Sequence, residues 1–430
     1  MDGELIQQTV QANRELLLTT LEELIRIRSV NRSPVGEEGE CQRYLARRLQ
    51  QAGYAVDLYC PDEVAELRKH PLATPDRQYP GRPNLSTLRK GTGGGRSLIL
   101  SGHIDTVPAG TLPWTQDPFT PLRVGDRIYG RGSNDMKAGV AINLFVLQML
   151  DLLGITLKGD LTIESAVDEE FGGVNGTLAA RLRGSVADAA ILTEPSGLRI
   201  CPAQRGGRTV HLLFRAMGGV PDSQPGAGVV TQLKCFMDAL PGFAAQRRHG
   251  CNVHPLYTHC GDPVPVTITK ISTGPWGSGE PITVPEECRV ELYWQFMPGE
   301  EEADADAEFD NWLKGVVAGA PDVFANAPAV TKAVRWLPGS AITADAPLCT
   351  ELASAAEEIN GSRPLIQGIE APCDLFAFHR FGIPAVLWGP VGGNAHGSDE
   401  FVTISSMLQA AAALLLFACR WCGVAGEVGT

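Results

Sequence analysis

The residue types in this chain that could do chemistry together are histidines and carboxylates. Two metal ions ~3.5–4 Å apart need about four ligands each and share one carboxylate. The side chains that could supply these ligands are His103, Asp135, Glu170, Glu194 and His396. A mixed histidine and carboxylate set favours zinc, with cobalt or manganese as substitutes. The sequence therefore predicts a site for two divalent ions.

Two further carboxylates lie next to these candidates. Asp105 follows His103 by two residues, so on an extended segment both side chains point the same way, and the carboxylate could hold the imidazole in one tautomer. Glu169 and Glu170 are adjacent and face opposite ways on an extended segment. One of them can bind metal while the other acts as a general base toward water.

Each of these residues alone is weak evidence, because a single histidine is more often structural and adjacent glutamates are more often a solvated pair. Their positions along the chain are more informative. Four short apolar runs each end in one of the polar clusters, and these runs are Ser97–Leu100, Leu161–Val167, Ala189–Leu192 and Pro384–Trp388. Strands that alternate with helical segments indicate an open α/β sheet, in which ligands bind beyond the carboxyl ends of the strands. The fold would bring the clusters together at that edge.

Asp135 is the one candidate that does not follow a strand. It lies in a turn with two glycines, Gly130 and Gly132, before an apolar helix expected over Val140–Leu153. Glycines let the backbone approach a site closely. Apolar spacing also predicts helices over residues 5–27 and 37–52.

The middle of the chain has a different character. Strands of alternating polarity are expected over Val210–Phe214, Val264–Ile271 and Arg289–Phe296, with a helix over Val229–Leu240. We expect an α+β domain inserted at residues 207–324 into a catalytic domain made of residues 1–206 and 325–430.

Composition restricts the partners. A formal charge of -13 and a pI near 5.2 disfavour binding to nucleic acid or to an anionic membrane. No apolar stretch is long enough for a transmembrane helix, and Met407–Ala418 is expected to be a buried helix. The first residues carry no secretory signal. The 11 scattered cysteines, an odd number, indicate reduced thiols and a cytoplasmic protein.

The chain resembles the dinuclear zinc aminoacylases and carboxypeptidases, a family that includes acetylornithine deacetylase, succinyl-diaminopimelate desuccinylase and glutamate carboxypeptidase. The matching motifs span nearly the whole chain. They are Leu100–Pro108, Trp114 with Asp117–Phe119, Tyr129–Lys137, Asp168–Glu170, Glu194–Ser196 and Ala395–Glu400. Glu194 followed by Pro-Ser is most similar to the deacetylase and desuccinylase branch.

The resemblance implies a mixed-sheet, zinc-peptidase-like catalytic domain with a smaller lid and dimerisation domain. It implies that Asp135 bridges two ions, that His103 and Glu194 complete one site, and that Glu170 and His396 complete the other. Glu169 would be the general base for a water that bridges the ions. The expected enzyme is a homodimeric metallohydrolase that cleaves an amide-type C–N bond in an N-acyl amino acid or small peptide.

The expected lid departs from the family pattern at three positions. Pro221 stands where a histidine commonly precedes the run Ser223–Gly228, Ile282 replaces an asparagine, and Gln295 replaces a carboxylate-binding arginine. Gln cannot supply the charge of Arg. This favours a second hypothesis, a specialised amidase or aryl-amine hydrolase whose substrate lacks the α-carboxylate. A third is an inactive binding protein of the same fold. Other histidines of the insert could replace the missing one, and these are His211, His249, His254 and His259.

Overall fold

The computed structural model describes residues 2–172, 174–221, 226–334 and 336–426 of the chain. These residues form two compact units. The first unit comprises Met1–Ala203, Ala341–Ile369 and Cys373–Thr430, and the second comprises Gln204–Ser340 and Glu370–Pro372. The insert therefore begins at 204 rather than 207 and ends at 340 rather than 324. Its end lies later because residues 329–332 form a strand of the second unit's sheet.

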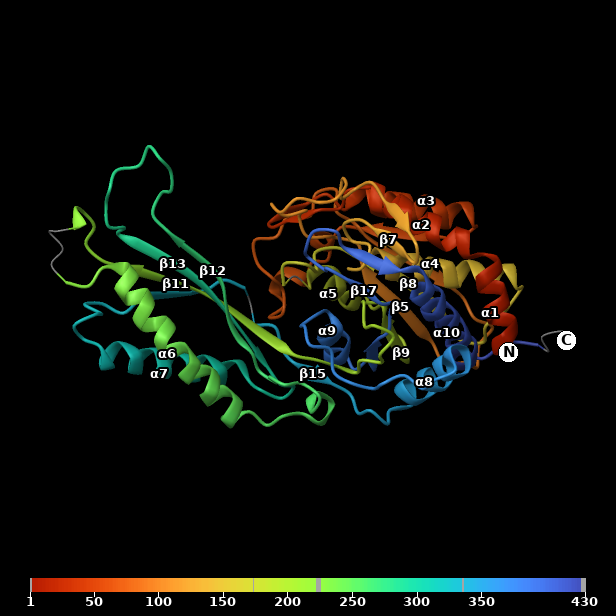
Figure 1. The fold of residues 1–430 in the computed structure, drawn as a ribbon. Coiled ribbons are helices and arrows are strands. Elements are labelled where there is room, and N and C mark those ends of the chain that lie inside the picture. Colours follow the sequence, from red (N-terminus) through yellow and green to blue (C-terminus); the bar gives the residue numbers. More distant parts are fainter. Residues whose placement is uncertain (1, 173, 222–225, 335, 427–430) are drawn as a thin grey trace. The chain divides into compact units, whose positions relative to one another are not determined.

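A six-stranded mixed sheet forms the centre of the first unit (Figure 1). Its order is β16 (Ala385–Leu387), β9 (Ala189–Leu192), β5 (Leu98–His103), β8 (Leu161–Ala166), β4 (Asn84–Arg89) and β3 (Val56–Tyr59). The first four strands are parallel neighbours, β4 pairs antiparallel with β8, and β3 pairs antiparallel with β4. These four parallel strands are the four apolar runs of the sequence, which confirms the predicted fold class.

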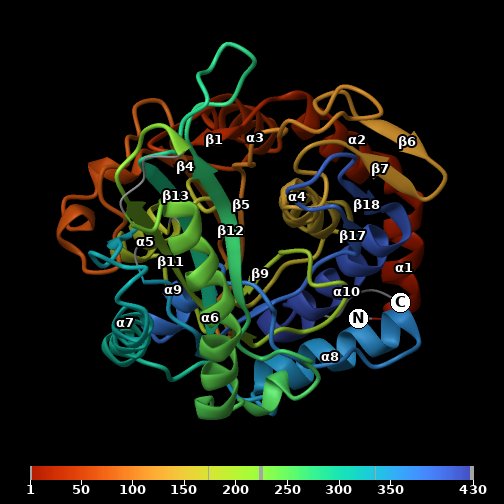
Figure 2. The ribbon, with the colours of Figure 1, turned by 60° about the vertical axis from the view of Figure 1, so that its left-hand side comes forward.

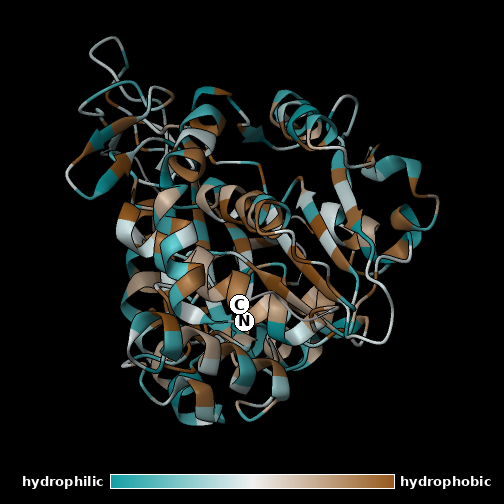
Figure 3. Cartoon of the chain, turned by 90° about the vertical axis from the view of Figure 1, so that its right-hand side faces the viewer, coloured by the Kyte–Doolittle hydropathy of each residue, from teal (hydrophilic) through white to brown (hydrophobic). Residues whose placement is uncertain are grey.

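Helices cover both faces of this sheet because its buried strands are apolar on both sides. Leu98 and Leu100 of β5 belong to the large core that includes the apolar residues of α4 (Lys137–Leu152) and α10 (Ile404–Cys422). Ile99, between them, belongs to a separate core with Leu375 and Phe378 of α9 (Leu375–Arg380). Figure 3 shows brown, hydrophobic residues in the central strands and helices of the chain. The alternation of side chains along β5 thus holds a three-layer arrangement together.

The helices expected over residues 5–27, 37–52, 140–153 and 407–418 form close to the predicted bounds, whereas the helices at Asn175–Leu182, Pro347–Asn360 and Leu375–Arg380 were not predicted. The expected helix over residues 5–27 is divided at Asn13, whose side chain hydrogen-bonds to the Thr9 carbonyl oxygen at 2.8 Å. The helices are α1 (Gly3–Ala12), α2 (Arg14–Arg26), α3 (Gly39–Gln51), α4 (Lys137–Leu152), α5 (Asn175–Leu182), α8 (Pro347–Asn360), α9 (Leu375–Arg380) and α10 (Ile404–Cys422).

α10 is the one described helix that is long and apolar enough to cross a membrane, judged by length and composition alone. It is 78% buried within the protein and packs against α8, α4 and α1. This burial is typical of the core helix of a globular unit, as the apolar run Met407–Ala418 predicts.

A second, smaller sheet in the first unit was not predicted. Its order is β17 (Gly392–Gly393), β18 (Phe401–Thr403), β7 (Arg127–Tyr129) and β6 (Leu122–Val124). β18 pairs with β7 in an antiparallel register that places Phe401 opposite Tyr129. The pairing brings together two loops, residues 130–136 and 394–400, that lie far apart in the sequence.

The second unit is an antiparallel sheet with two helices on one face (Figure 2). The strand order is β12 (Val266–Thr273), β13 (Glu287–Phe296), β11 (Gly206–Arg215) and β14 (Ala329–Lys332). α6 (Val229–Gly250) and α7 (Glu302–Gly319) bury Phe236, Phe243 and Phe309 against it. This α+β unit therefore has its own hydrophobic core.

Short elements complete the chain: β1 (Asn31–Arg32), β2 (Val35–Gly36), η1 (Pro61–Glu63), η2 (Leu67–Lys69), β10 (Ala203–Gln204), η4 (Pro255–Tyr257) and β15 (Ser340–Ala341).

Candidate metal centre

His103 is the last residue of β5 and is 3% exposed. Its Nδ1 lies 3.0 Å from the backbone carbonyl oxygen of Asp105. A carbonyl only accepts, so Nδ1 carries the proton and Nε2 is left to bind a metal. The sequence assigned this orienting contact to the Asp105 carboxylate, but the nearer carboxylate oxygen is 3.6 Å from Nδ1.

The Asp105 carboxylate has a different use. It accepts hydrogen bonds from the backbone N–H groups of Glu169 and Glu170, with Oδ2–N distances of 3.0 and 3.1 Å, and from the Asn31 side chain at 2.9 Å. One carboxylate thus fixes the backbone of both adjacent glutamates and, through its own carbonyl, the ring of His103. Asp105 positions the centre without entering it.

Asp135 lies between the two histidines. Its Oδ1 is 3.1 Å from Nε2 of His103, and its Oδ2 is 3.4 Å from Nε2 of His396. The ligand atoms of His103, Asp135 and Glu194 lie within 4.8 Å of one another, and so do those of Asp135, Glu170 and His396. The two groups share only Asp135, which contributes one oxygen to each.

The loop that carries Asp135 is fixed by a residue that the sequence analysis did not single out. Glu400 is 1% exposed and accepts from the backbone N–H groups of Gly132, Asn134 and Asp135 at 2.9, 2.9 and 3.0 Å. Arg131 also donates to Glu400, with an Nη1–Oε2 distance of 2.7 Å. Glu400 ends the motif that contains His396, and this spacing is the signal that could have indicated it.

Gly132 shows why this loop contains glycine. Its φ is +78°, a left-handed conformation that other residues adopt at a cost. A Cβ atom at this position would also lie 2.6 Å from Cγ2 of Thr106. A side chain would therefore displace the loop that presents Asp135.

A bend after β8 lies directly before Glu169 and Glu170. Asp168 is buried with a φ of +68°, and its carboxylate accepts from the Tyr79 hydroxyl at 2.6 Å. Beyond it, Oε2 of Glu170 lies 2.8 Å from Nε2 of His396, whereas Oε2 of Glu169 lies 3.9 Å from Nε2 of His103. The two carboxylates thus face different histidines.

Glu194 follows β9 and completes the first group. Its Oε1 lies 3.6 Å from Nε2 of His103. Gly389 packs directly behind it, because a Cβ there would lie 2.1 Å from the Glu194 carbonyl oxygen. The segment after β16 therefore supports the backbone that presents Glu194.

Crowding of carboxylates in a buried space perturbs their pKa values. Burial is the main cause that raises the pKa of Glu194 to about 8 and that of Glu170 to about 7, and Asp135 adds to both. Burial also raises the pKa of Glu169 well above its usual value, with His103 opposing and Asp374 adding to the rise. Asp374 is a buried carboxylate near the centre that the sequence analysis missed, because no motif marked it.

The same carboxylates raise the pKa values of the two histidines. Hydrogen bonds to Asp135 and Glu170 raise the pKa of His396 to about 11. Burial lowers the pKa of His103, but Glu194, Asp105 and Asp135 outweigh it and hold the value well above 6.5. The centre therefore favours positive charge strongly, and each group offers both nitrogen and oxygen donors. Two divalent cations fit this donor set and would relieve the repulsion between its carboxylates.

The three positions that depart from the family pattern, Pro221, Ile282 and Gln295, lie in the second unit. Gln295 is 7% exposed, and its Oε1 accepts from Nη1 of Arg205 at 2.7 Å while its Nε2 donates to the Glu370 carbonyl oxygen at 2.8 Å. Ile282 is 87% exposed and Pro221 is exposed. Ser223, Gln224 and Pro225, in the expected run 223–228, lie outside the described residues.

Two arginines near the start of the second unit differ in their partners. Arg208 forms ion pairs with Glu302 and Asp306 at 2.6 Å each. Its charge is therefore neutralised by carboxylates of the same unit. Arg205 is 4% exposed and contacts Gln295 and the face of Tyr257, with no carboxylate partner within the described ranges. Arg205 is thus the one of these two whose charge is not neutralised.

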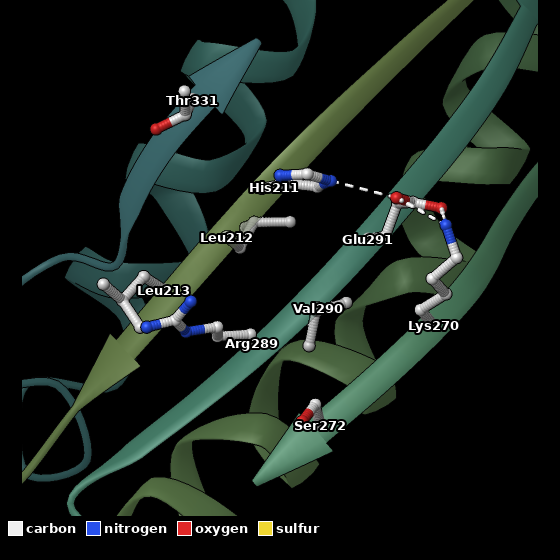
Figure 4. Close-up of a pocket in the computed structure, with 9 residues that line it drawn as sticks. All are labelled: His211, Leu212, Leu213, Lys270, Ser272, Arg289, Val290, Glu291 and Thr331. Carbon is white, nitrogen blue, oxygen red and sulfur yellow. Dashed lines mark hydrogen bonds and ion pairs between the residues drawn. The ribbon is translucent and has the colours of Figure 1, made fainter. Parts of the chain in front are cut away.

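The other histidines of the second unit have local partners. His211 pairs with Glu291 at 2.9 Å, and Lys270 pairs with the same carboxylate at 2.8 Å. These three line a hollow of about 550 Å³ on the strands of the sheet (Figure 4). His249 contacts the Ala245 carbonyl oxygen and His254 accepts from the Leu256 N–H. His211, Lys270 and Glu291 pair with one another, and Arg289, which also lines the hollow, pairs with Glu287 at 3.2 Å, so the hollow is a solvated sheet surface rather than a reaction site.

A mixed α/β sheet with two carboxylate-sharing ligand groups at its carboxyl edge defines the class of metal-dependent hydrolases. The chain belongs to peptidase family M20/M25/M40, whose model matches residues 99–420. It is a hydrolase of carbon–nitrogen bonds.

Several relatives match almost end to end. N-formyl-4-amino-5-aminomethyl-2-methylpyrimidine deformylase of Bacillus subtilis is 24% identical over 443 residues, covering 97% of each chain. Succinyl-diaminopimelate desuccinylase of a Methylobacterium species is 28% identical and covers 87% of this chain and 89% of its own. Among solved structures, the dipeptidase Dug1p of Saccharomyces cerevisiae superposes with a TM-score of 0.78 at 13% identity, covering 98% and 99% of the two chains. A dinuclear metal-binding peptidase of Bacillus subtilis superposes with a TM-score of 0.60 at 15% identity, covering 96% of this chain and 99% of its own.

Proposed function

We propose that this enzyme removes a small acyl group, such as formyl, from an amine of a small molecule that lacks a free α-carboxylate. The observation that carries the proposal is the use of Gln295. Its carbonyl and amide are both engaged within the second unit, and it brings no charge to a position where the family places a carboxylate-binding arginine. The full-length similarity to a pyrimidine deformylase supports the same substrate class.

The residues of the first unit fit this reaction. When bound, two divalent ions would acidify a water and polarise the scissile carbonyl. His103 and Glu194 would hold one ion, Glu170 and His396 the other, and Asp135 both. Glu169 lies beside these ligands but belongs to neither ligand group. It takes a proton from the attacking water and returns it to the departing amine.

A second candidate is the hydrolysis of N-succinyl or N-acetyl amino acids. It is supported by similarity to the desuccinylases, including one of Leptothrix cholodnii that is 33% identical over 187 residues and 42% of this chain. That match covers less than half of the chain, and Gln295 counts against it, so we place it second.

A substrate screen separates these candidates. N-formyl, N-acetyl and N-succinyl amines and dipeptides are assayed with added zinc, cobalt or manganese, each acyl group on an amine with and without an α-carboxylate. We expect the highest kcat/KM for an N-formyl amine without the carboxylate. Higher values for N-succinyl amino acids would establish the second candidate, and turnover of neither group would contradict both.

Three finer features belong to the same proposal. Zinc is the proposed metal, because the donor set mixes imidazole with carboxylate. The proposed homodimer forms through the second unit, whose edge strands β12 and β14 each have one unpaired edge within the described sheet. A cytoplasmic location is supported by 11 free cysteines. Metal analysis of purified protein, its mass in solution and fractionation of cells test these features in turn.

A further inference from the structure

A third group of metal-binding side chains lies in the second unit. His259 and Cys260 are adjacent residues between η4 and β12, and Glu370 comes from the short segment 370–372 of the same unit. Their ligand atoms lie within 4.8 Å of one another. None of the three belongs to the two groups around Asp135.

The separations match those between the ligands of a tetrahedral ion. Nε2 of His259 lies 3.4 Å from Sγ of Cys260 and 3.4 Å from Oε1 of Glu370. Bonds of 2.0–2.1 Å to nitrogen, about 2.3 Å to sulfur and 2.0–2.2 Å to oxygen at tetrahedral angles give edges of about 3.3–3.6 Å. Both separations from Nε2 of His259 therefore match edges of a tetrahedral zinc site, and the thiol sulfur and the carboxylate oxygen lie within 4.8 Å of each other.

The backbone around these residues is fixed by other contacts. The Cys260 N–H donates to the Tyr257 carbonyl oxygen at 3.0 Å, which closes a turn after η4. The Tyr257 ring stacks on the His259 imidazole, with centroids 6.4 Å apart and an interplanar angle of 18°. The Glu370 carbonyl accepts from Gln295 at 2.8 Å. The side chains of His259 and Glu370 remain 28% and 44% exposed, so an ion can enter from solvent.

An ordinary surface ion pair explains this cluster less well. At 3.4 Å the His259–Glu370 contact is longer than the usual 2.7–3.2 Å of a hydrogen bond. A surface pair also gives no reason for a thiol at the same point. Sulfur, imidazole and carboxylate together are donors that zinc binds and that magnesium and calcium do not favour.

We propose that His259, Cys260 and Glu370 form a third transition-metal site, selective for zinc and similar ions, with a water in the fourth position. Binding replaces the Cys260 thiol proton by the metal and releases that proton to solvent, so affinity rises with pH. The ion joins two segments of the second unit about a hundred residues apart in sequence. The proposal goes beyond the hydrolytic function and does not depend on it.

Cobalt titration of the metal-free protein tests the site. A thiolate bound to Co²⁺ gives a charge-transfer absorption in the near ultraviolet, whereas the two groups around Asp135 contain no sulfur donor. We expect uptake of about three equivalents, with the thiolate absorption accompanying one of them. Cys260→Ala should abolish the absorption and reduce uptake to about two equivalents.

Two matched variants serve as controls. Cys251→Ala removes a half-buried thiol of the same unit that belongs to none of the three groups. Cys373→Ala removes a thiol whose pKa is raised by burial and by the nearby Glu194 carboxylate. Both should keep the absorption. Glu370→Gln and His259→Ala should each weaken the thiolate-linked uptake by more than about tenfold.

Wild-type protein without thiolate absorption, or Cys260→Ala with unchanged absorption and stoichiometry, would show that no such site exists. Loss of the absorption in Cys373→Ala would place the thiolate beside the catalytic carboxylates instead. The two sulfur-free equivalents are counted separately, so failure of the third site leaves the proposed hydrolase intact.

Discussion

Glu169 and Glu170, which are adjacent after β8, lie in different environments, and we expect different roles for them. Glu170 contacts His396 at 2.8 Å and belongs to a ligand group, whereas Glu169 belongs to neither group. The bend at Asp168 and the two hydrogen bonds to Asp105 hold this difference in place. A general base must lie close to the metal ligands without binding an ion itself. Glu169 meets this condition, because it is adjacent to Glu170 but belongs to neither ligand group.

We therefore predict opposite effects for the two alanine variants. Glu169→Ala should keep both catalytic ions and lose ~10²–10⁴-fold in kcat, since that is the contribution of a general base. Glu170→Ala should lose an ion instead. Metal analysis and kinetics on the same samples check this. Near wild-type turnover by Glu169→Ala with both ions bound would refute the assignment.

Gln295 leads to a prediction about substrate charge. An α-carboxylate buried without a charged partner is costly, and Arg208 is already paired with Glu302 and Asp306. Substrates with a free α-carboxylate should therefore not be preferred over the matched primary amides.

The test compares kcat/KM for substrates that carry a free α-carboxylate with kcat/KM for the matched primary amides. A charged hydrogen bond is worth ~1.5–3 kcal/mol, so a true carboxylate site would give at least about a tenfold preference in kcat/KM. A preference of that size for the acid would refute the prediction and identify Arg205 as the residue to mutate.

At the scale of elements, the small sheet β17–β18–β7–β6 connects the two loops of the centre. β18 and β7 pair, and Glu400, directly before β18, accepts from three backbone N–H groups of the loop that carries Asp135. The position of the Asp135 carboxylate therefore depends on Glu400, which belongs to neither ligand group.

Glu400→Gln tests this dependence. Gln has one acceptor oxygen where the carboxylate has two, so at least one N–H of the loop loses its partner. Affinity for the catalytic ions should fall ~10–100-fold, the usual effect of changing an outer-shell partner. Metal competition titration measures it. Asp126→Asn, an exposed contact to Ser405 at the other end of β18, is the matched control and should leave the affinity unchanged.

The four parallel strands and all five ligand candidates could be predicted from the sequence, because apolar runs and their terminal motifs are local signals. The small sheet could not be predicted. Strands of two or three residues show no periodicity, and β18 pairs with a strand more than two hundred residues earlier. Asn31 and Asp374 were missed for the same reason, since their roles come from contacts between distant segments.

Each of the two units of the chain has its own hydrophobic core. In the second unit, Phe243 is fully buried and stacks on Trp312 with centroids 4.8 Å apart. The first unit has its own core around α4 and α10. Unfolding need not be a single transition in such a chain.

Phe243→Ala should destabilise the second unit by ~3–5 kcal/mol, because it removes a large buried side chain. Hydrogen exchange should become faster at the amides of β11 and β13 and stay unchanged in β5 and β8. Val230→Ala, at a 56% exposed position of the same helix, should change stability by less than about 0.5 kcal/mol. Equal acceleration in both units would show that the cores are coupled.

We propose that two divalent ions at the groups around Asp135 carry out the hydrolysis. To test this, zinc is titrated into metal-free Cys260→Ala protein while bound metal and amide hydrolysis are followed together. We expect no hydrolysis before metal is added and full recovery at about two equivalents per chain. Hydrolysis by the metal-free protein at the rate of the metal-loaded enzyme would contradict it.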